Sequence, residues 1–185
     1  MAAAGLQWIQ VRAKTLGDDE LLPALETCAR LRERWDFRRW VNARADLARL
    51  VGADGLHLGQ DDLPPAAARA CVGPAMWIGR STHDLDQCAA AAADPDVGVV
   101  AFGPVFATAS KPDAEPVTGI TALAAARRLT ARPLVAIGGI DAGRLPEVFG
   151  AGADGAAILG ALGEGRDIAA RVRALQEAAE AAVPR

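Results

Sequence analysis

An amide and two cations alternate along one short stretch near the start of the chain. Gln10, Arg12 and Lys14 are each separated by one residue, and they continue the apolar stretch Leu6–Val11, which is typical of a strand. Alternate residues of an extended chain point to the same side, so the three side chains are predicted to face one way. Two cations on one side of a strand end suit a diphosphate. A solvated strand end is the alternative that these residues leave open.

Carboxylates and an amide follow the next two predicted strands. Asn42 ends one of them, and Asp61 and Asp62 follow a glycine turn at Gly59 after the other. Magnesium prefers oxygen ligands and shares them with substrate phosphates, so these carboxylates are a candidate Mg²⁺ site. An N-cap before Pro64 is the alternative.

Hydroxyl groups are placed in two further segments where phosphate could bind. Ser81 and Thr82 come just before a predicted helix, and the N-terminus of a helix favours anions. Thr108, Ser110 and Lys111 lie in a long loop, where two hydroxyls and an ammonium could clamp a phosphate. Simple capping in the first case and a surface loop in the second are the alternatives.

Two glycine turns follow the last two predicted strands. Gly138 and Gly139 follow one strand, and Gly160 follows Leu159 at the end of the other. Without side chains, such turns let backbone N–H groups approach a phosphate closely. Glycine turns after the last two strands are the usual phosphate site of one barrel class.

Short strand-like stretches alternate with helical stretches along the whole chain. The predicted strands are Leu6–Val11, Phe37–Asn42, Gly55–Leu58, Met76–Gly79, Val97–Phe102, Pro133–Ile137 and Gly155–Leu159. The predicted helices are Asp18–Arg34, Ala45–Val51, Pro65–Cys71, Asp84–Ala93, Thr121–Thr130, Asp141–Phe149 and Ile168–Ala182. This alternation predicts parallel strands joined by right-handed crossovers. Its regular rhythm favours an α/β fold of the (β/α)₈ TIM-barrel type over a Rossmann-like sheet.

The predicted strands number one fewer than a closed barrel of this type needs. Ala2–Gly5 resembles the tail of a helix that enters the first visible strand, so we expect the barrel's own first strand to be missing from this chain. The segments 52–55 and 152–155 both read Gly-Ala-Asp-Gly and are predicted as equivalent turns from helix to strand. A homodimer would cover the exposed sheet edge that an absent strand leaves.

Composition and charge restrict the class of protein. A chain of 185 residues predicts one domain over residues 1–185, and a net charge of −3 argues against a nucleic-acid surface. The three cysteines, Cys28, Cys71 and Cys88, are far apart, which argues against a disulfide framework or a zinc site and favours the cytoplasm. Neither a signal peptide nor an apolar run of about 20 residues is present, so no membrane association is expected.

The order of these motifs resembles the superfamily of thiamine-phosphate synthase and its relative, the thiazole tautomerase TenI, over nearly the whole chain. The matching segments are Gln10–Lys14, Asn42–Asp46, Gly52–Asp62, Ile78–His83, Phe102–Lys111, Ile137–Ile140 and Gly152–Leu162. The resemblance implies a synthase that joins 4-amino-2-methyl-5-hydroxymethylpyrimidine diphosphate to thiazole phosphate and releases diphosphate. It implies C–O cleavage to a stabilised pyrimidine cation, which the thiazole nitrogen then traps.

The resemblance also implies roles for individual residues, carried over position by position. The catalytic residues it implies, all of which would bind the diphosphate, are Arg12, Lys14, Ser81 and Lys111. The substrate-binding residues it implies are Gln10 and Asn42 for the pyrimidine substrate, and Thr108, Ser110, Gly139, Leu159 and Gly160 for the thiazole phosphate. It implies Asp62 as a ligand of the cofactor Mg²⁺.

Three positions depart from the synthase pattern or separate its two branches. Ala43 stands where synthases usually carry an aspartate ligand, which weakens the expected Mg²⁺ site, and Gly160 replaces a usual serine. Pro104 stands where the tautomerase branch carries a catalytic histidine, and Gly59–Asp62 is a synthase element, so the synthase is favoured. A metal-free tautomerase, a non-catalytic binder of phosphorylated ligands, and one part of a fusion protein are the alternatives.

Overall fold

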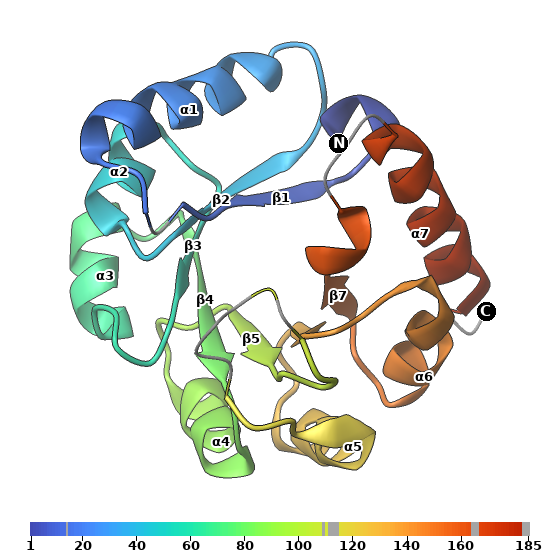
Figure 1. Cartoon of the computed structure of the whole chain (residues 1–185). Helices are drawn as coiled ribbons and strands as arrows, with labels where there is room; N and C mark the ends of the chain where they lie inside the picture. The colour runs from blue at the N-terminus through green and yellow to red at the C-terminus, as the bar shows by residue number, and fades with distance from the viewer. Residues whose placement is uncertain (14, 109, 111–114, 164–166, 183–185) are drawn as a thin grey trace. The chain divides into compact units, whose positions relative to one another are not determined.

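The computed structural model describes residues 1–13, 15–108, 110, 115–163 and 167–182 (Figure 1). The strands are β1 (Trp8–Val11), β2 (Arg38–Asn42), β3 (Gly55–Leu58), β4 (Trp77–Thr82), β5 (Val99–Phe102), β6 (Leu134–Ile137) and β7 (Gly155–Ala157). The α-helices are α1 (Asp18–Leu31), α2 (Ala45–Leu50), α3 (Pro65–Val72), α4 (Leu85–Ala93), α5 (Gly119–Leu129), α6 (Leu145–Gly150) and α7 (Ile168–Ala182). Short 3₁₀ helices are η1 (Ala2–Ala4), η2 (Ala142–Arg144) and η3 (Gly160–Leu162). Every strand is followed by a helix, which confirms the α/β fold of TIM-barrel type, with the predicted seven strands among the described residues.

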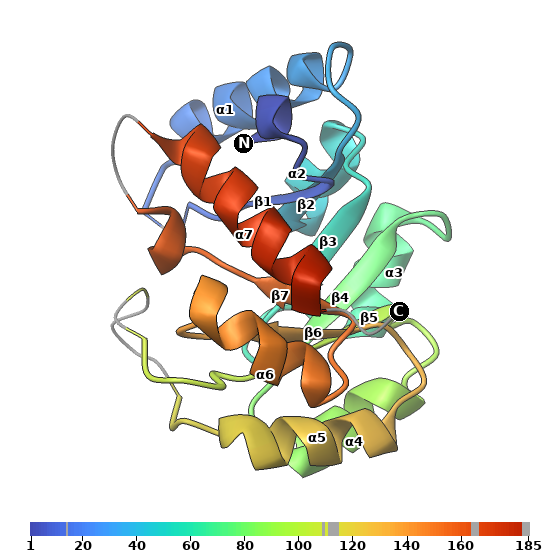
Figure 2. The ribbon, with the colours of Figure 1, turned by 90° about the vertical axis from the view of Figure 1, so that its right-hand side faces the viewer.

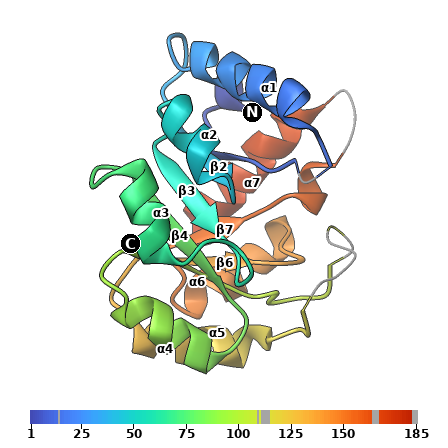
Figure 3. The same cartoon turned by 90° about the vertical axis from the view of Figure 1, so that its left-hand side faces the viewer.

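The chain divides into two compact units, and residues 1–79 form the first. In it β1, β2 and β3 are parallel neighbours, with Val11 opposite Val41 and Val41 opposite Leu56. Figure 3 shows α1, α2 and α3 along the outer side of these strands. Leu56 and Ile78 are fully buried in the core between strands and helices. Burial of such side chains stabilises the fold by about 1.5–3 kcal/mol each.

Residues 80–185 form the second unit, where β5, β6 and β7 are parallel neighbours. Helix α4 packs beside α5, and α6 beside α7, as Figure 2 shows for the last pair. Val100, Phe102, Leu123 and Leu134 are fully buried in the core of this unit. The four-residue strand β5 is buried along its whole length, which explains why its sequence is a continuous apolar run.

The two Gly-Ala-Asp-Gly segments form equivalent turns, as predicted. Asp54 accepts a 2.8 Å hydrogen bond from the backbone N–H of Arg39, and Asp154 accepts a 2.8 Å bond from that of Leu134. In each case the aspartate pins the start of its own strand to the start of the preceding strand. One short sequence therefore fixes the strand register once in each unit.

Most boundaries agree with the sequence-based predictions to within two residues, and three differ by more. Strand β4 was predicted to end at Gly79 but runs to Thr82, because the Thr82 hydroxyl is buried and donates a 2.9 Å bond to the carbonyl of Ala101. Helix α1 ends at Leu31, three residues before the predicted end, and its N-cap is Gly17. The segment predicted as one helix up to Phe149 divides into η2 and α6.

Cys28, Cys71 and Cys88 are all free thiols, and burial raises the pKa of Cys88. No helix in the described ranges combines the length and the apolar character that a bilayer crossing needs. The single domain, the cytoplasmic location and the homodimer stay predictions.

Candidate functional site

In the first unit, the ends of β1 and β2 bring the predicted pyrimidine-binding residues together. Gln10 donates a 3.1 Å hydrogen bond from Nε2 to Oδ1 of Asn42, 32 residues away in sequence. Gln10 and Arg12 are exposed, whereas Val11 and Ala13 pack against the core, so the predicted alternation is confirmed. Lys14 lies outside the described residues. The arrangement offers one amide pair and a guanidinium on the same side of β1.

Two tryptophans that the sequence analysis did not single out lie beside this amide pair. The rings of Trp8 and Trp40 are stacked, with centroids 5.1 Å apart and planes inclined by 22°. Trp40 is buried and Trp8 is exposed. Among the described residues Trp40 Nε1 has no hydrogen-bond partner, and a buried unpaired donor costs about 1–3 kcal/mol. The alternation that identified Gln10 and Arg12 extends back to Trp8 and could have revealed it.

A cluster of charges stands just after β2. Arg44 donates hydrogen bonds to both Asp18 and Asp46, which ties the start of α1 to the start of α2. The guanidinium of Arg44 lowers the pKa of Asp46 to about 2 and also lowers the pKa of Asp18. Asp46 is therefore engaged by an arginine.

This cluster predicts a loss of stability at low pH. The folded-state pKa of Asp46 lies below its unfolded value, so its contribution is complete above about pH 4 and is lost as the pH falls toward 2. Between pH 4 and pH 2, we expect the melting temperature of Asp46→Asn to fall less than that of the unchanged chain. Asp19→Asn, which changes an exposed carboxylate of the same helix as Asp18, is the matched control. Equal pH profiles for the two variants would contradict the role given to Asp46.

Asp62, the predicted Mg²⁺ ligand, closes the glycine turn after β3. Its Oδ2 accepts a 2.7 Å hydrogen bond from the backbone N–H of Gly59, and Asp61 beside it is exposed. Within the described ranges, no three His, Cys, Asp or Glu side chains gather closely enough to hold a metal ion. Magnesium bound through one or two carboxylates usually completes its shell with substrate phosphates and water. The donors therefore fit a Mg²⁺ that is held mainly by a diphosphate.

Ala43, which replaces the usual aspartate, has an unusual backbone conformation. Its φ is 64°, in the left-handed region, and it is the one residue other than glycine with positive φ among the described residues. Its N–H donates a 2.8 Å bond to the carbonyl of His57 on β3. Aspartate and asparagine tolerate this conformation better than alanine. The backbone at this position therefore suits the residue that the synthase pattern has there.

In the second unit, Ser81 and its neighbours differ from the prediction. Ser81 lies in β4 instead of preceding a helix, and it is partly buried. The helix cap is Asp84, whose Oδ1 accepts a 2.7 Å bond from the N–H of Gln87. Capping, the alternative given for this segment, is thus supplied by Asp84. Ser81 lies at the carboxyl end of β4, where barrel enzymes place their chemistry.

The loop after β5 packs directly against the glycine turn after β6. Phe106 donates a 3.1 Å backbone bond to the carbonyl of Gly138. Gly139 has φ 63°, and a Cβ there would lie 2.4 Å from the carbonyl oxygen of Ala107. Only glycine fits this turn, for both reasons. The predicted phosphate turn is therefore held against the predicted phosphate loop.

Arg144 is a further residue that the sequence analysis missed. Its guanidinium lies 4.5 Å above the centroid of the Phe106 ring and donates a hydrogen bond to the carbonyl of Gly139. It also lies 3.9 Å from Asp141. A cation fixed at the glycine turn favours anion binding there. The sequence signal for this role was the position of Arg144, three residues after the N-cap Asp141 and just beyond the glycine pair.

The remaining thiazole-phosphate candidates meet at one place in the same unit. Ser110 donates a 3.2 Å backbone bond to the hydroxyl of Thr108. A Cβ on Gly160 would lie 3.1 Å from the Ser110 hydroxyl, so this glycine lies beside the loop. Leu159 is 62% exposed. Lys111 lies outside the described residues.

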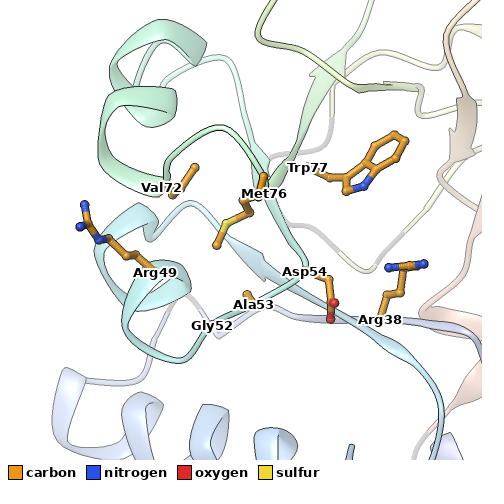
Figure 4. A pocket seen from close by; sticks show the side chains of 9 residues that line it. Arg38, Arg49, Gly52, Ala53, Asp54, Val72, Met76 and Trp77 are labelled. Atoms are coloured by element: carbon orange, nitrogen blue, oxygen red, sulfur yellow. The ribbon is translucent and has the colours of Figure 1, made fainter.

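A surface hollow of about 330 Å³ lies in the first unit (Figure 4). Arg38, Asp54 and Trp77 line it, and each stands at or just before the start of its strand. Barrel enzymes carry their chemistry at the opposite, carboxyl ends of the strands, where Gln10, Arg12 and Asn42 are found. The hollow is therefore separate from the candidate site.

Comparison with known proteins supports the resemblance drawn from the motifs. A family model described as thiamine monophosphate synthase matches residues 1–162. The thiamine-phosphate synthase of Methanoculleus marisnigri is 42% identical over 98% of this chain and 85% of its own length. That of Mycobacterium sp. strain KMS is 43% identical over 95% of this chain and 81% of its own length. The thiamine-phosphate synthase of Synechococcus sp. strain CC9605 is 39% identical over 88% of this chain but only 46% of its own length, so the chain spans about half of that relative.

A solved structure agrees with these sequence matches. The thiamine phosphate pyrophosphorylase from Pyrococcus furiosus superposes with a TM-score of 0.86 at 29% identity, covering 96% of this chain and 85% of that one. Sequence and fold thus point to one group of proteins. The chain belongs to the thiamine monophosphate synthase family.

Proposed function

We propose that this chain joins 4-amino-2-methyl-5-hydroxymethylpyrimidine diphosphate to thiazole phosphate, which yields thiamine phosphate and diphosphate. The observation that carries the proposal is the 42% identity to a thiamine-phosphate synthase over 98% of the chain. The candidate site supports it, because polar groups suited to each substrate gather at strand ends in each unit.

The first unit supplies groups suited to the pyrimidine diphosphate. The Gln10–Asn42 pair offers amide donors and acceptors to an aminopyrimidine ring. Arg12 points to the same side and is exposed, so its guanidinium can bind diphosphate oxygens. Cleavage of the C–O bond leaves both bonding electrons on the departing diphosphate oxygen. A fixed cation at that oxygen stabilises the charge as it develops.

The second unit supplies groups suited to the thiazole phosphate. The loop residues Thr108 and Ser110 contact each other, and Gly160 lies beside Ser110. The same loop packs against Gly139, whose carbonyl accepts a hydrogen bond from Arg144. Their role is to bind and orient the phosphate, so that the thiazole nitrogen can attack the pyrimidine methylene carbon. That attack forms the new C–N bond with the nitrogen lone pair and requires no protein nucleophile.

Magnesium is part of the proposal, with Asp62 as its ligand from the protein. When bound, Mg²⁺ neutralises diphosphate charge and so favours its departure. A single carboxylate gives little affinity for the free ion. The metal is therefore expected to bind together with the substrate.

An assay of the purified chain tests both the reaction and its metal requirement. We expect thiamine phosphate to form from the two precursors with Mg²⁺ and product formation to stop when EDTA is added. The melting temperature without substrate should not change on chelation, because the metal arrives with the diphosphate. Absence of product at every Mg²⁺ concentration would refute the proposed reaction.

Restoring the usual carboxylate should tighten the metal site. We expect Ala43→Asp to lower the Mg²⁺ concentration that gives half-maximal rate, because the left-handed backbone at position 43 accepts aspartate. Ala43→Asn, which accepts the same backbone but adds no charge, is the matched control. An unchanged magnesium titration in Ala43→Asp would show that position 43 does not face the metal.

The tautomerase reaction is the second arm of the assay. Pro104, at the position of the tautomerase histidine, is buried and follows a cis peptide bond from Gly103. The Nδ1 atom of His83 lies 2.6 Å from the carbonyl oxygen of Gly103, so a histidine does stand beside this position. Metal-independent isomerisation of thiazole carboxylate phosphate would establish that alternative. Binding of phosphorylated ligands without either product would establish the non-catalytic one.

A further inference from the structure

Trp8 and Trp40 stack on the same side of the sheet as the Gln10–Asn42 pair. Gln10 is the direct neighbour of Trp40 across β1 and β2, and Trp8 precedes Gln10 by two residues. Asn42 follows Trp40 by two residues and therefore shares its side. The stacked indoles thus lie next to the amide pair, one step nearer the start of the strands. We call these two residues the tryptophan floor.

Gly55 and Gly79 make room for the indole ring of Trp40. A Cβ on Gly55 would lie 2.5 Å from the indole of Trp40, and a Cβ on Gly79 would lie 3.1 Å from its Cζ3 atom. The benzene ring of Trp40 therefore reaches across β3 to the start of β4.

Two properties set the floor apart from the fully buried residues of the core. Trp8 is 45% exposed although it belongs to a strand whose other side faces the core. Trp40 is only 6% exposed, yet its Nε1 donor meets no acceptor among the described residues. Small-molecule sites commonly combine aromatic walls with a few polar groups. An aromatic surface beside an amide pair and an unpaired donor has that composition.

The order of groups along β1 matches the order of groups in the pyrimidine substrate. An aromatic ring, an amide and a guanidinium follow one another at Trp8, Gln10 and Arg12, with about 6.6 Å between successive members. The substrate likewise has a flat heteroaromatic ring at one end and a diphosphate at the other. With the diphosphate at Arg12, the ring points along β1 toward Gln10 and Trp8.

We propose that the tryptophan floor is the aromatic wall of the pyrimidine subsite and sets its selectivity for a flat aminopyrimidine ring. This inference rests on the proposed synthase function. The ring stacks on the exposed face of Trp8, while Gln10 and Asn42 hydrogen-bond to its edge. Trp40 supports Trp8 from behind.

Equilibrium binding tests this role without turnover. Calorimetry would measure the Kd of the pyrimidine diphosphate, in EDTA and without thiazole phosphate, and compare it with the Kd of inorganic diphosphate. We expect Trp8→Leu to weaken binding of the pyrimidine diphosphate about tenfold, because stacking of a base on an aromatic side chain contributes on that scale. Trp40→Phe keeps an aromatic ring but reduces the surface on which Trp8 stacks, and a loss of about threefold to tenfold is expected. Binding of inorganic diphosphate should change in neither variant.

Trp35→Phe is the matched control, because Trp35 lies after α1 and contacts Arg34 instead of the floor. If both floor variants keep the melting temperature and bind the pyrimidine diphosphate as tightly as the unchanged chain, the inference is wrong. It is also wrong if the unchanged chain does not bind the pyrimidine diphosphate more tightly than inorganic diphosphate. Failure of the proposed function is a separate result, since it appears as absence of thiamine phosphate in the unchanged chain.

Discussion

Arg12→Ala is expected to lower kcat/KM for the pyrimidine diphosphate by about 10²–10³. The variant removes a cation aimed at the oxygen on which negative charge develops, and loss of one such group typically costs that much. Arg12 is exposed and outside the core, so the melting temperature should stay close to that of the unchanged chain. Initial rates at varied pyrimidine diphosphate, with saturating thiazole phosphate and Mg²⁺, would measure the effect.

Arg49→Ala is the matched control for this experiment. Arg49 is also exposed, but it lies on helix α2 and lines the separate hollow (Figure 4). Removing a positive charge there should leave kcat/KM within about twofold, because screening weakens long-range effects at physiological salt. Equal losses of kcat/KM in the two variants would mean that the reaction depends on the net charge of the chain and not on a contact between Arg12 and the diphosphate.

Gly139→Ala is expected to damage the thiazole-phosphate turn and the stability of the fold together. The left-handed backbone alone costs alanine about 1–2 kcal/mol. The new Cβ would also lie 2.4 Å from the carbonyl oxygen of Ala107 and 2.9 Å from the Cβ of Phe106, so the loop must move. We expect KM for thiazole phosphate to rise at least about tenfold, since 1.4 kcal/mol corresponds to a factor of ten.

Gly143→Ala provides the comparison for this second variant. A Cβ on Gly143 would meet only the carboxylate of Asp141, at an ordinary 3.5 Å, and the residue lies in the short helix η2 close to the turn. Urea unfolding and initial rates at varied thiazole phosphate should therefore match the unchanged chain. An unchanged KM for thiazole phosphate in Gly139→Ala would show that this turn does not bind the thiazole phosphate.

The strength of local patterns explains which elements were predictable. Gly55–Leu58 was predicted to the residue, because an apolar run bounded by glycines defines its own limits. The end of β4 was not predictable, since the hydroxyls of Ser81 and Thr82 are typical of both caps and strand ends. Burial of Thr82 against Ala101 decided between the two, and that contact joins residues 19 positions apart.

The sequence by itself determined the α/β fold, the turns at Asp54 and Asp154, and the placement of Gln10 and Arg12 on one side of β1. Each of these follows from periodicity or from hydrogen bonds that a short segment always makes. Only the tertiary structure decided that Gln10 bonds to Asn42, that Trp8 and Trp40 stack beside them, and that Arg144 braces the turn at Gly139. The partners in these contacts lie on different strands or loops, so their meeting depends on strand register and packing, which no local sequence pattern encodes.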